Sequence, residues 1–189
     1  MELLSPLYRH IDNHQTLKIV YQSFNADEPT EIIFFPYLLK EFRNRWFVFG
    51  SKPDSAQVYN LALDRIKSIE PIDIEFVENP DFDSEHFFDN VIGVSTSVNS
   101  YPRRIKFWAS KEQSKYIKTK PLHHSQKLIQ ENPDGSCEFQ INVVINFELI
   151  SILLSYGSGV RVISPPVVVK WMKKQIEGMR KAYEDSYCQ

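Results

Sequence analysis

The run Arg43–Gly50, RNRWFVFG, constrains the fold of this chain more than any other stretch. Its four successive aromatic and β-branched side chains favour a buried β-strand over a helix, and Gly50 closes the run. A second apolar run, Leu61–Leu63, follows and ends in the pair Asp64–Arg65. We therefore expect buried strands with arginines where the chain leaves the sheet, which is a rigid base for a charged pocket.

The first half of the chain predicts one short helix and about five closely spaced strands. An apolar stripe marks the helix over Leu3–Ile11, and Asp64–Ile66 has the pattern of a single helical turn. The strands are expected at residues 17–24, 31–42, 45–50, 57–63 and 68–77. This pattern is typical of a small, strongly bent antiparallel β-barrel or sandwich.

The second half predicts the order β-α-β-β-α-β between Arg103 and Ile163, which is that of a ferredoxin-like fold. Ser110 and Asn146 are expected to cap the two helices, and the tetrapeptide 132–135, NPDG, predicts a hairpin. The elements are expected at residues 103–109, 111–118, 126–131, 136–145, 147–156 and 160–163. We thus predict an α+β protein with an SH3-like or Sm-like barrel in residues 1–78 and a ferredoxin-like unit in residues 103–189. An acidic linker with a short helix is expected in residues 79–102, with the boundary between units at 94–102.

A long C-terminal helix is expected after Pro165–Pro166 because apolar residues recur there at helical spacing. This stripe consists of Val168, Trp171, Met172, Ile176, Met179 and Tyr183. The ferredoxin-like unit is complete before the helix begins, so the stripe must cover an open face, an edge or another chain. Dimers are the commonest symmetric assembly, and we predict a homodimer.

Charge and cysteine content exclude several classes of protein. The net charge is −2, but residues 64–90 hold nine acidic and two basic side chains, and residues 103–127 hold eight basic and one acidic. Such segregation indicates a local basic surface or an interface between the two segments. The two cysteines do not have metal-ligand spacing. The sequence has no apolar run of transmembrane length and no signal-peptide pattern, so we expect a cytoplasmic protein.

Several short motifs carry a resemblance to a known family. Tyr21-Gln22-Ser23, Pro36-Tyr37-Leu38-Leu39, Arg45-Trp46-Phe47-Val48 and Leu63-Asp64-Arg65-Ile66 occur in this order. Together they resemble the WYL domain of bacterial transcriptional regulators, with Trp46-Phe47-Val48 in place of the name-giving triplet. The segments Phe88–Val94, Pro121–Gln126 and Glu148–Leu149 followed by Gly157 resemble the C-terminal extension that follows WYL domains.

This resemblance implies the ligand-sensing and dimerising portion of a transcriptional regulator. WYL domains sense ligands, in some members a nucleotide or single-stranded nucleic acid, and usually follow a winged-helix domain that binds DNA. Only about a dozen residues precede the first expected strand here, so DNA would be contacted only through a missing N-terminal domain. The sequence is compatible with two interpretations, a part of a longer regulator and a stand-alone sensor. Relatives often carry additional arginines where this chain reads Tyr59–Ala62, which weakens the case for a phosphate-bearing ligand.

The predicted ligand pocket consists of Tyr21, Arg43, Arg45, Trp46 and Arg65. Arginine recognises phosphate or carboxylate through two parallel hydrogen bonds, and a tyrosine at the rim of a pocket can stack or donate a hydrogen bond. The simpler interpretation is structural: Trp46 packs in the core, and Arg65 pairs with Asp64 or an acidic neighbour.

A second candidate surface is basic. Arg103, Arg104 and Lys106 precede Phe107 and Trp108, a composition typical of surfaces that bind single-stranded nucleic acid. The alternative function is therefore a nucleic-acid-binding module. Lys111, Lys115 and Lys118 are interpreted instead as the solvated face of a helix.

The sequence favours neither catalysis nor a cofactor. His123 and His124 are adjacent, and no acidic or cysteine residue stands at ligand spacing beside them. They are expected to hold a loop through hydrogen bonds. No phosphate-binding glycine loop and no nucleophile elbow occur, so we expect a protein that is not an enzyme.

Overall fold

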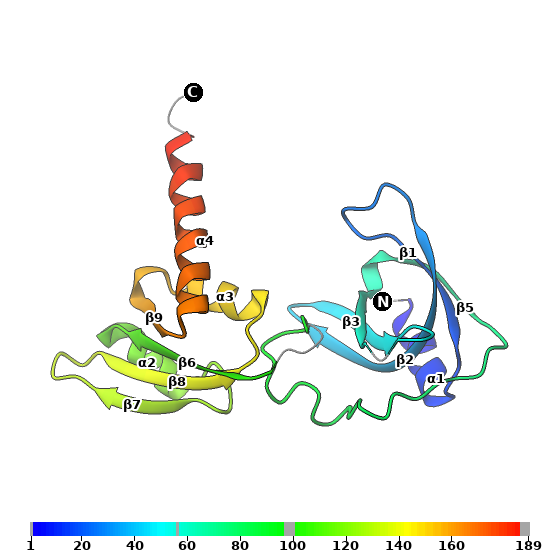
Figure 1. The fold of residues 1–189 in the computed structure, drawn as a ribbon, viewed down its shortest axis with the longest axis horizontal. Helices are drawn as coiled ribbons and strands as arrows, with labels where there is room; N and C mark the ends of the chain where they lie inside the picture. The colour runs from blue at the N-terminus through cyan, green and yellow to red at the C-terminus, as the bar shows by residue number, and fades with distance from the viewer. Residues whose placement is uncertain (1, 56, 97–100, 186–189) are drawn as a thin grey trace. The chain divides into compact units, whose positions relative to one another are not determined.

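The computed structural model describes residues 2–55, 57–96 and 101–185. The chain divides into two compact units, Met1–Asp89 and Asn90–Gln189, each of which is described by itself. It is a mixed α+β protein with two antiparallel sheets and four α-helices in the described part (Figure 1). No helix in this part is both long enough and apolar enough to cross a membrane. Part of the boundary predicted at 94–102, residues 97–100, lies outside the described residues.

The first unit is a five-stranded antiparallel sheet with one helix. Its elements are α1 (Leu4–Asp12), β1 (Leu17–Tyr21), β2 (Thr30–Phe42), β3 (Arg45–Ser51), β4 (Tyr59–Ala62), a 3₁₀ turn (Leu63–Arg65) and β5 (Ile66–Pro71). The strand order is β4-β3-β2-β1-β5. No pairing joins β4 to β5 among the described residues, so the predicted closed barrel is not found.

The strand β2 pairs with β1 along its first part and with β3 along its second part. Residues 30–34 pair with β1, and residues 35–42 pair with β3, with a register shift between Pro36 and Leu38. Proline cannot donate a hydrogen bond to the ladder, and the bulge occurs at this residue. The core beneath the sheet includes Leu7 of α1 and Phe34 of β2, both fully buried.

Close packing explains Gly50, which ends the apolar run of β3. A Cβ at this position would lie 2.1 Å from the carbonyl oxygen of Phe35 and 2.6 Å from the ring of Phe34. Only glycine therefore allows β2 and β3 to approach in this register.

Residues 72–96 contain turns, bends and irregular backbone, and the short helix predicted in 79–102 does not appear among the residues described there. Side chains compete with helix formation in this segment: Asn79 Oδ1 accepts from Asp81 N at 3.0 Å, and Asp83 Oδ1 accepts from Glu85 N at 2.9 Å. Aromatic rings hold the segment to the first unit, because Phe88 packs on Phe49 with 4.9 Å between ring centroids.

The second unit is a four-stranded antiparallel sheet with helices on one face. Its elements are β6 (Arg103–Ala109), α2 (Lys111–Thr119), β7 (Lys127–Glu131), β8 (Cys137–Val143), α3 (Phe147–Leu154), a 3₁₀ turn (Gly157–Gly159), β9 (Val160–Ser164) and α4 (Pro166–Asp185). The strand order is β7-β8-β6-β9. Ile117 of α2, Leu149 of α3 and Val168 of α4 lie in the same core as Phe107 and Phe139 of the sheet.

The first part of α4 joins this core, and its second part does not. Val168 and Met172 are buried, whereas Ile176, Met179 and Tyr183 are 54%, 53% and 71% exposed. Figure 1 shows the red end of α4 extending away from the sheet of its own unit. The predicted apolar stripe is therefore divided between the core and solvent.

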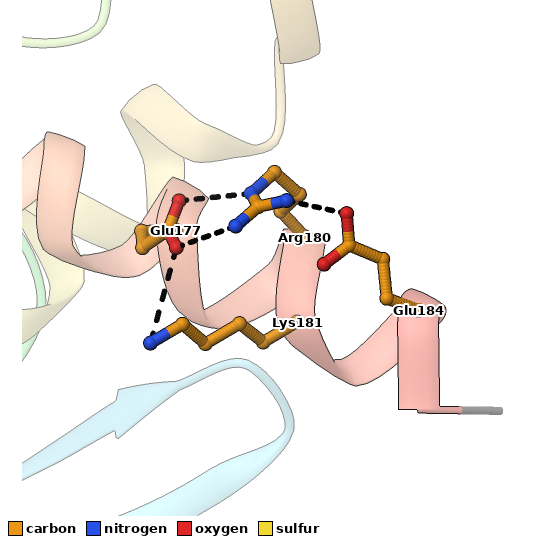
Figure 2. A network of polar contacts seen from close by, with 4 residues as sticks. All are labelled: Glu177, Arg180, Lys181 and Glu184. Atoms are coloured by element: carbon orange, nitrogen blue, oxygen red, sulfur yellow. Dashed lines mark hydrogen bonds and ion pairs between the residues drawn. The ribbon is translucent and has the colours of Figure 1, made fainter.

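Ion pairs stabilise the exposed part of α4 (Figure 2). Arg180 donates to both oxygens of Glu177, at 3.0 and 2.9 Å, and also pairs with Glu184, while Lys181 lies 3.9 Å from Glu177. The hydrogen bond from Arg180 lowers the pKa of Glu177. Such i,i+3 and i,i+4 pairs stabilise a helix locally, by about 0.2–0.5 kcal/mol each in isolated helices.

Candidate functional site

Two arginines of the predicted pocket meet at an exposed aromatic ring in the first unit. The guanidinium carbon of Arg65 lies 4.0 Å from the ring centroid of Phe24, and that of Arg45 lies 5.8 Å from the same centroid. Phe24 is 73% exposed. We call Phe24, Arg45 and Arg65 the arginine–phenylalanine cluster.

Local hydrogen bonds fix the loop that carries Phe24. Gln22 donates through Nε2 to the carbonyl oxygens of Ala26 and Asp27, at 3.3 and 3.0 Å. Its backbone N–H donates to the carbonyl oxygen of Arg65 at 3.1 Å. The loop after β1 is thus tied to the 3₁₀ turn before β5, which brings Phe24 and Arg65 together.

The charges in this cluster are unequally paired. Arg45 Nε lies 3.1 Å from Asp64 Oδ2, with both side chains about half exposed. Arg65 Nε is buried and has no hydrogen-bond partner in the described part of the chain. The sequence suggested that Asp64 pairs with Arg65, but the ion pair joins it to Arg45. Arg65 therefore keeps its positive charge available against the face of an aromatic ring, an arrangement that cation–π attraction favours.

A surface hollow of about 570 Å³ adjoins Arg45. It is lined by Glu2, Leu3, Leu4, Asn44, Arg45, Trp46, Leu63, Asp64 and Ile66. Trp46 also lines a more apolar hollow of about 620 Å³ between α1 and the second half of β2. Arg45 and Trp46 thus lie at one hollow, while Arg65 faces the ring of Phe24.

The other two predicted pocket residues lie differently. Arg43 is exposed in the two-residue turn between β2 and β3, with its guanidinium carbon 5.3 Å from the ring of Phe42. Its φ of 51° is the left-handed conformation that such a tight hairpin requires. Tyr21 is half-buried and packs against the core of the first unit.

Phe24 is the residue that sequence reasoning missed. The available signal was a large aromatic side chain inside a polar turn, where an exposed ring needs an explanation. Its contact with Arg65 depends on the pairing of β1 with β5, strands about 45 residues apart in the chain.

The three basic residues predicted to bind nucleic acid do not share one face of β6. Arg104 and Lys106 alternate with buried Ile105 and Phe107, so they lie on the face opposite the helices. Arg103, at the start of the strand, alternates in step with Ile105 and Phe107 and so belongs to the opposite face from Arg104 and Lys106. Its guanidinium carbon is 4.1 Å from the ring of Tyr101. Arg103 is therefore separate from the other two.

Lys118 of α2 and His123 make polar contacts within the second unit. Lys118 Nζ lies 2.8 Å from Glu131 Oε2, and this hydrogen bond raises the pKa of Lys118. His123 Nδ1 and Ser125 Oγ are 2.8 Å apart, and Ser125 in turn accepts from Asn142 N at 2.9 Å. Within the described residues, no cluster of three or more His, Cys, Asp or Glu side chains could hold a metal ion.

Comparison with known domain families now assigns both units. Residues 2–71 match the WYL domain, and residues 101–180 match the WCX domain. The chain contains a WYL domain followed by a WCX domain. The WYL domain includes the arginine–phenylalanine cluster, and the WCX domain includes the sheet that carries Arg104 and Lys106.

Solved structures are similar at low sequence identity. Proteasome accessory factor B/C (PafBC) of Arthrobacter aurescens is 17% identical, with a TM-score of 0.37 over 93% of this chain and 26% of that one. A CRISPR Cas-related protein is 11% identical, with a TM-score of 0.54 over 96% of this chain and 51% of that one. The chain thus spans about a quarter and a half of these two proteins. No curated protein sequence matches it significantly.

Proposed function

We propose that this WYL–WCX chain is the ligand-sensing and dimerising part of a bacterial transcriptional regulator and that it is not an enzyme. The ligand is a small anion, a nucleotide or single-stranded nucleic acid, and it binds at the arginine–phenylalanine cluster. The observation that carries this proposal is Arg65, whose guanidinium stacks on an exposed ring and has no acidic partner among the residues that the structure describes. An aromatic face beside a free guanidinium suits a base and a phosphate together.

The finer architecture belongs to the same proposal. Five antiparallel strands with a 3₁₀ turn before the last one support an SH3-like arrangement of the WYL domain. The strand order β7-β8-β6-β9 with helices on one face supports a ferredoxin-like arrangement of the WCX domain.

The test is calorimetric titration of the chain with a mononucleotide and with a short oligothymidylate. Arg65→Ala is expected to weaken binding about 10- to 100-fold, the range for loss of a charge-assisted hydrogen bond. Its midpoint of thermal unfolding should stay near that of the parent, because Arg65 makes no ion pair in the described part of the chain and its Nε has no hydrogen-bond partner there to lose.

Phe24→Ala should weaken binding without changing the charge. Arg9→Ala is the matched control, since it removes an exposed arginine from α1 of the same domain. Equal binding by Arg65→Ala and the parent, together with a large loss of thermal stability, would make Arg65 structural and reject the site.

We also propose that a second copy of this chain covers the exposed part of α4. The exposed residues Ile176, Met179 and Tyr183 follow each other at spacings of three and four residues, the pattern of a two-stranded coiled-coil seam. The ion pairs of Figure 2 join charged residues to one another within the helix. A regulator that reads a repeated half-site needs such two-fold symmetry.

A further inference from the structure

The sheet of the WCX domain has one face that no helix covers in the described part of the chain. The strands alternate strictly: Cys137, Phe139 and Ile141 of β8 are buried, whereas Glu138 and Gln140 between them are half-buried. The same alternation holds in β6 and β9, and every inward residue joins the core beneath the helices. The outward residues therefore form a second surface.

Strand register brings four cations together on this surface. Lys106 of β6 lies opposite Gln140 of β8, which lies opposite Lys127 of β7. Trp108 lies between Arg161 of β9 and Glu138 of β8. We define the basic sheet face by its outward residues Arg104, Lys106, Trp108, Lys127, Glu138, Gln140, Arg161 and Ile163. Figure 1 shows β7, β8 and β6 side by side in this sheet.

Four positive charges face one carboxylate on the basic sheet face. Within the described residues, Arg104, Lys106, Lys127 and Arg161 are in no ion pair, unlike Lys118 on the helix side. Because adjacent strands are about 4.8 Å apart, the mutual repulsion of these charges is relieved by binding an anion. A polyanion complements this charge better than a single small anion does.

An aromatic residue lies among the cations. Trp108 is half-buried, and the guanidinium carbon of Arg161 lies 5.5 Å from its ring. Ile163, 40% exposed, follows on the same face of β9. Lysines and arginines that track phosphates beside a ring that stacks on a base are the two parts of a single-strand-binding surface.

We propose that the basic sheet face of the WCX domain binds single-stranded nucleic acid. The phosphates contact Arg104, Lys106, Lys127 and Arg161, and an unstacked base lies on Trp108. A duplex is disfavoured because its bases are stacked and cannot reach the ring. This site goes beyond the proposed function, since it uses other residues in the other domain.

The first test measures how the affinity for a short oligothymidylate depends on salt in the Arg65→Ala chain, in which the site proposed in the WYL domain is weakened. Binding to single strands weakens with a slope of about −0.7 per neutralised phosphate, so four cations predict a slope of about −2.8. The double variant Arg104→Gln, Lys106→Gln should reduce the slope to about −1.4 and weaken binding about tenfold at 0.15 M salt.

The matched control is Lys115→Gln, Lys120→Gln, which removes the same charge from exposed positions on and just after α2. It should leave affinity and slope nearly unchanged. An equal loss in the control, or an unchanged slope in the double variant of β6, would overturn the proposal. Equal or tighter binding of the corresponding duplex would overturn the assignment to single strands.

A second measurement follows Trp108 directly. Trp46→Phe and Trp171→Phe leave Trp108 as the one tryptophan of the chain, and saturating oligothymidylate should quench its fluorescence through stacking. Unchanged emission at saturation would remove Trp108 from the site and overturn the proposal.

The two proposals fail separately. Mononucleotide binding should be weakened by Arg65→Ala and unaffected by the double variant of β6. Loss of oligonucleotide binding in the β6 variant with intact mononucleotide binding supports the basic sheet face, whatever the result for Arg65.

Discussion

Replacing Glu148 with alanine should loosen the segment that leads into the WCX domain. Glu148 lies in the first turn of α3 and is almost fully buried. Its Oε1 atom accepts hydrogen bonds from Val94 N at 3.3 Å, Ser95 N at 3.1 Å and Ser95 Oγ at 2.8 Å. Gly93, with φ of 87°, passes so close that a Cβ there would lie 2.5 Å from Glu148 Cγ.

The magnitude follows from the three donors that lose their acceptor. Each hydrogen bond to a charged group contributes about 1.5–3 kcal/mol, and an unsatisfied buried donor costs about 1–3 kcal/mol. The other oxygen, Oε2, is buried without a partner in the described part of the chain, and removing it offsets part of the loss. We expect Glu148→Ala to lower the free energy of unfolding by about 3 kcal/mol, and Glu148→Gln, which keeps one acceptor, by about 1 kcal/mol.

Amide hydrogen exchange is the decisive assay. The N–H groups of Val94 and Ser95 should lose protection in Glu148→Ala, and urea unfolding followed by fluorescence of Trp108 and Trp171 should report the loss of stability. Glu112→Ala is the matched control, because Glu112 is an exposed carboxylate in the first turn of α2. Unchanged exchange at Val94 and Ser95, with stability within about 0.5 kcal/mol of the parent, would refute this account of Glu148.

Three further predictions concern packing, pH and assembly. Gly50→Ala should destabilise the WYL domain by at least about 2 kcal/mol in thermal unfolding because of its contacts with Phe34 and Phe35; Gly178→Ala, with nothing within 4 Å, should leave stability equal or higher. The hydrogen bond to Asp89 raises the pKa of His86. Protonated His86 therefore stabilises the folded state below the unfolded pKa of about 6.5, and this stabilisation is lost as pH rises through the higher pKa of the folded state. In an NMR titration, Asp89→Asn should therefore lower the pKa of His86. Sedimentation should find a dimer at micromolar concentration that Ile176→Glu with Met179→Glu dissociates without unfolding; a dimer that persisted would place the interface elsewhere.

Local patterns in the sequence predicted the elements well, because their determinants lie within a few residues. Ser110 and Asn146 were expected to cap α2 and α3, and each accepts from a backbone N–H three residues on, at 3.3 and 2.8 Å. The strand β6 has the bounds that its alternation predicts. The mixed α+β class and the presence of a WYL domain also followed from the sequence.

Local patterns were less informative where side chains and distant segments compete. The strand expected at 68–77 ends at Pro71, after which Ile72 N donates to the carbonyl oxygen of Thr16. The helix expected in 79–102 is replaced by turns, because Asn79 and Asp83 bind the backbone and phenylalanines pack on the first core. The end of the strand and the packing of the phenylalanines depend on partners far away in the chain, whereas Asn79 and Asp83 bind backbone groups two residues on.

The sequence by itself determined which residues could carry charge and stacking, and the tertiary structure decided which of them meet. Arg45, Arg65 and Trp46 were identifiable from their motifs, but only the pairing of β1 with β5 brings Phe24 to Arg65, and Asp64 binds Arg45 instead. Arg161 and Lys127 join Lys106 and Trp108 only through the register of four strands. Hydrogen bonds between neighbours along the chain can be predicted from local sequence, whereas contacts across a sheet depend on how every strand pairs.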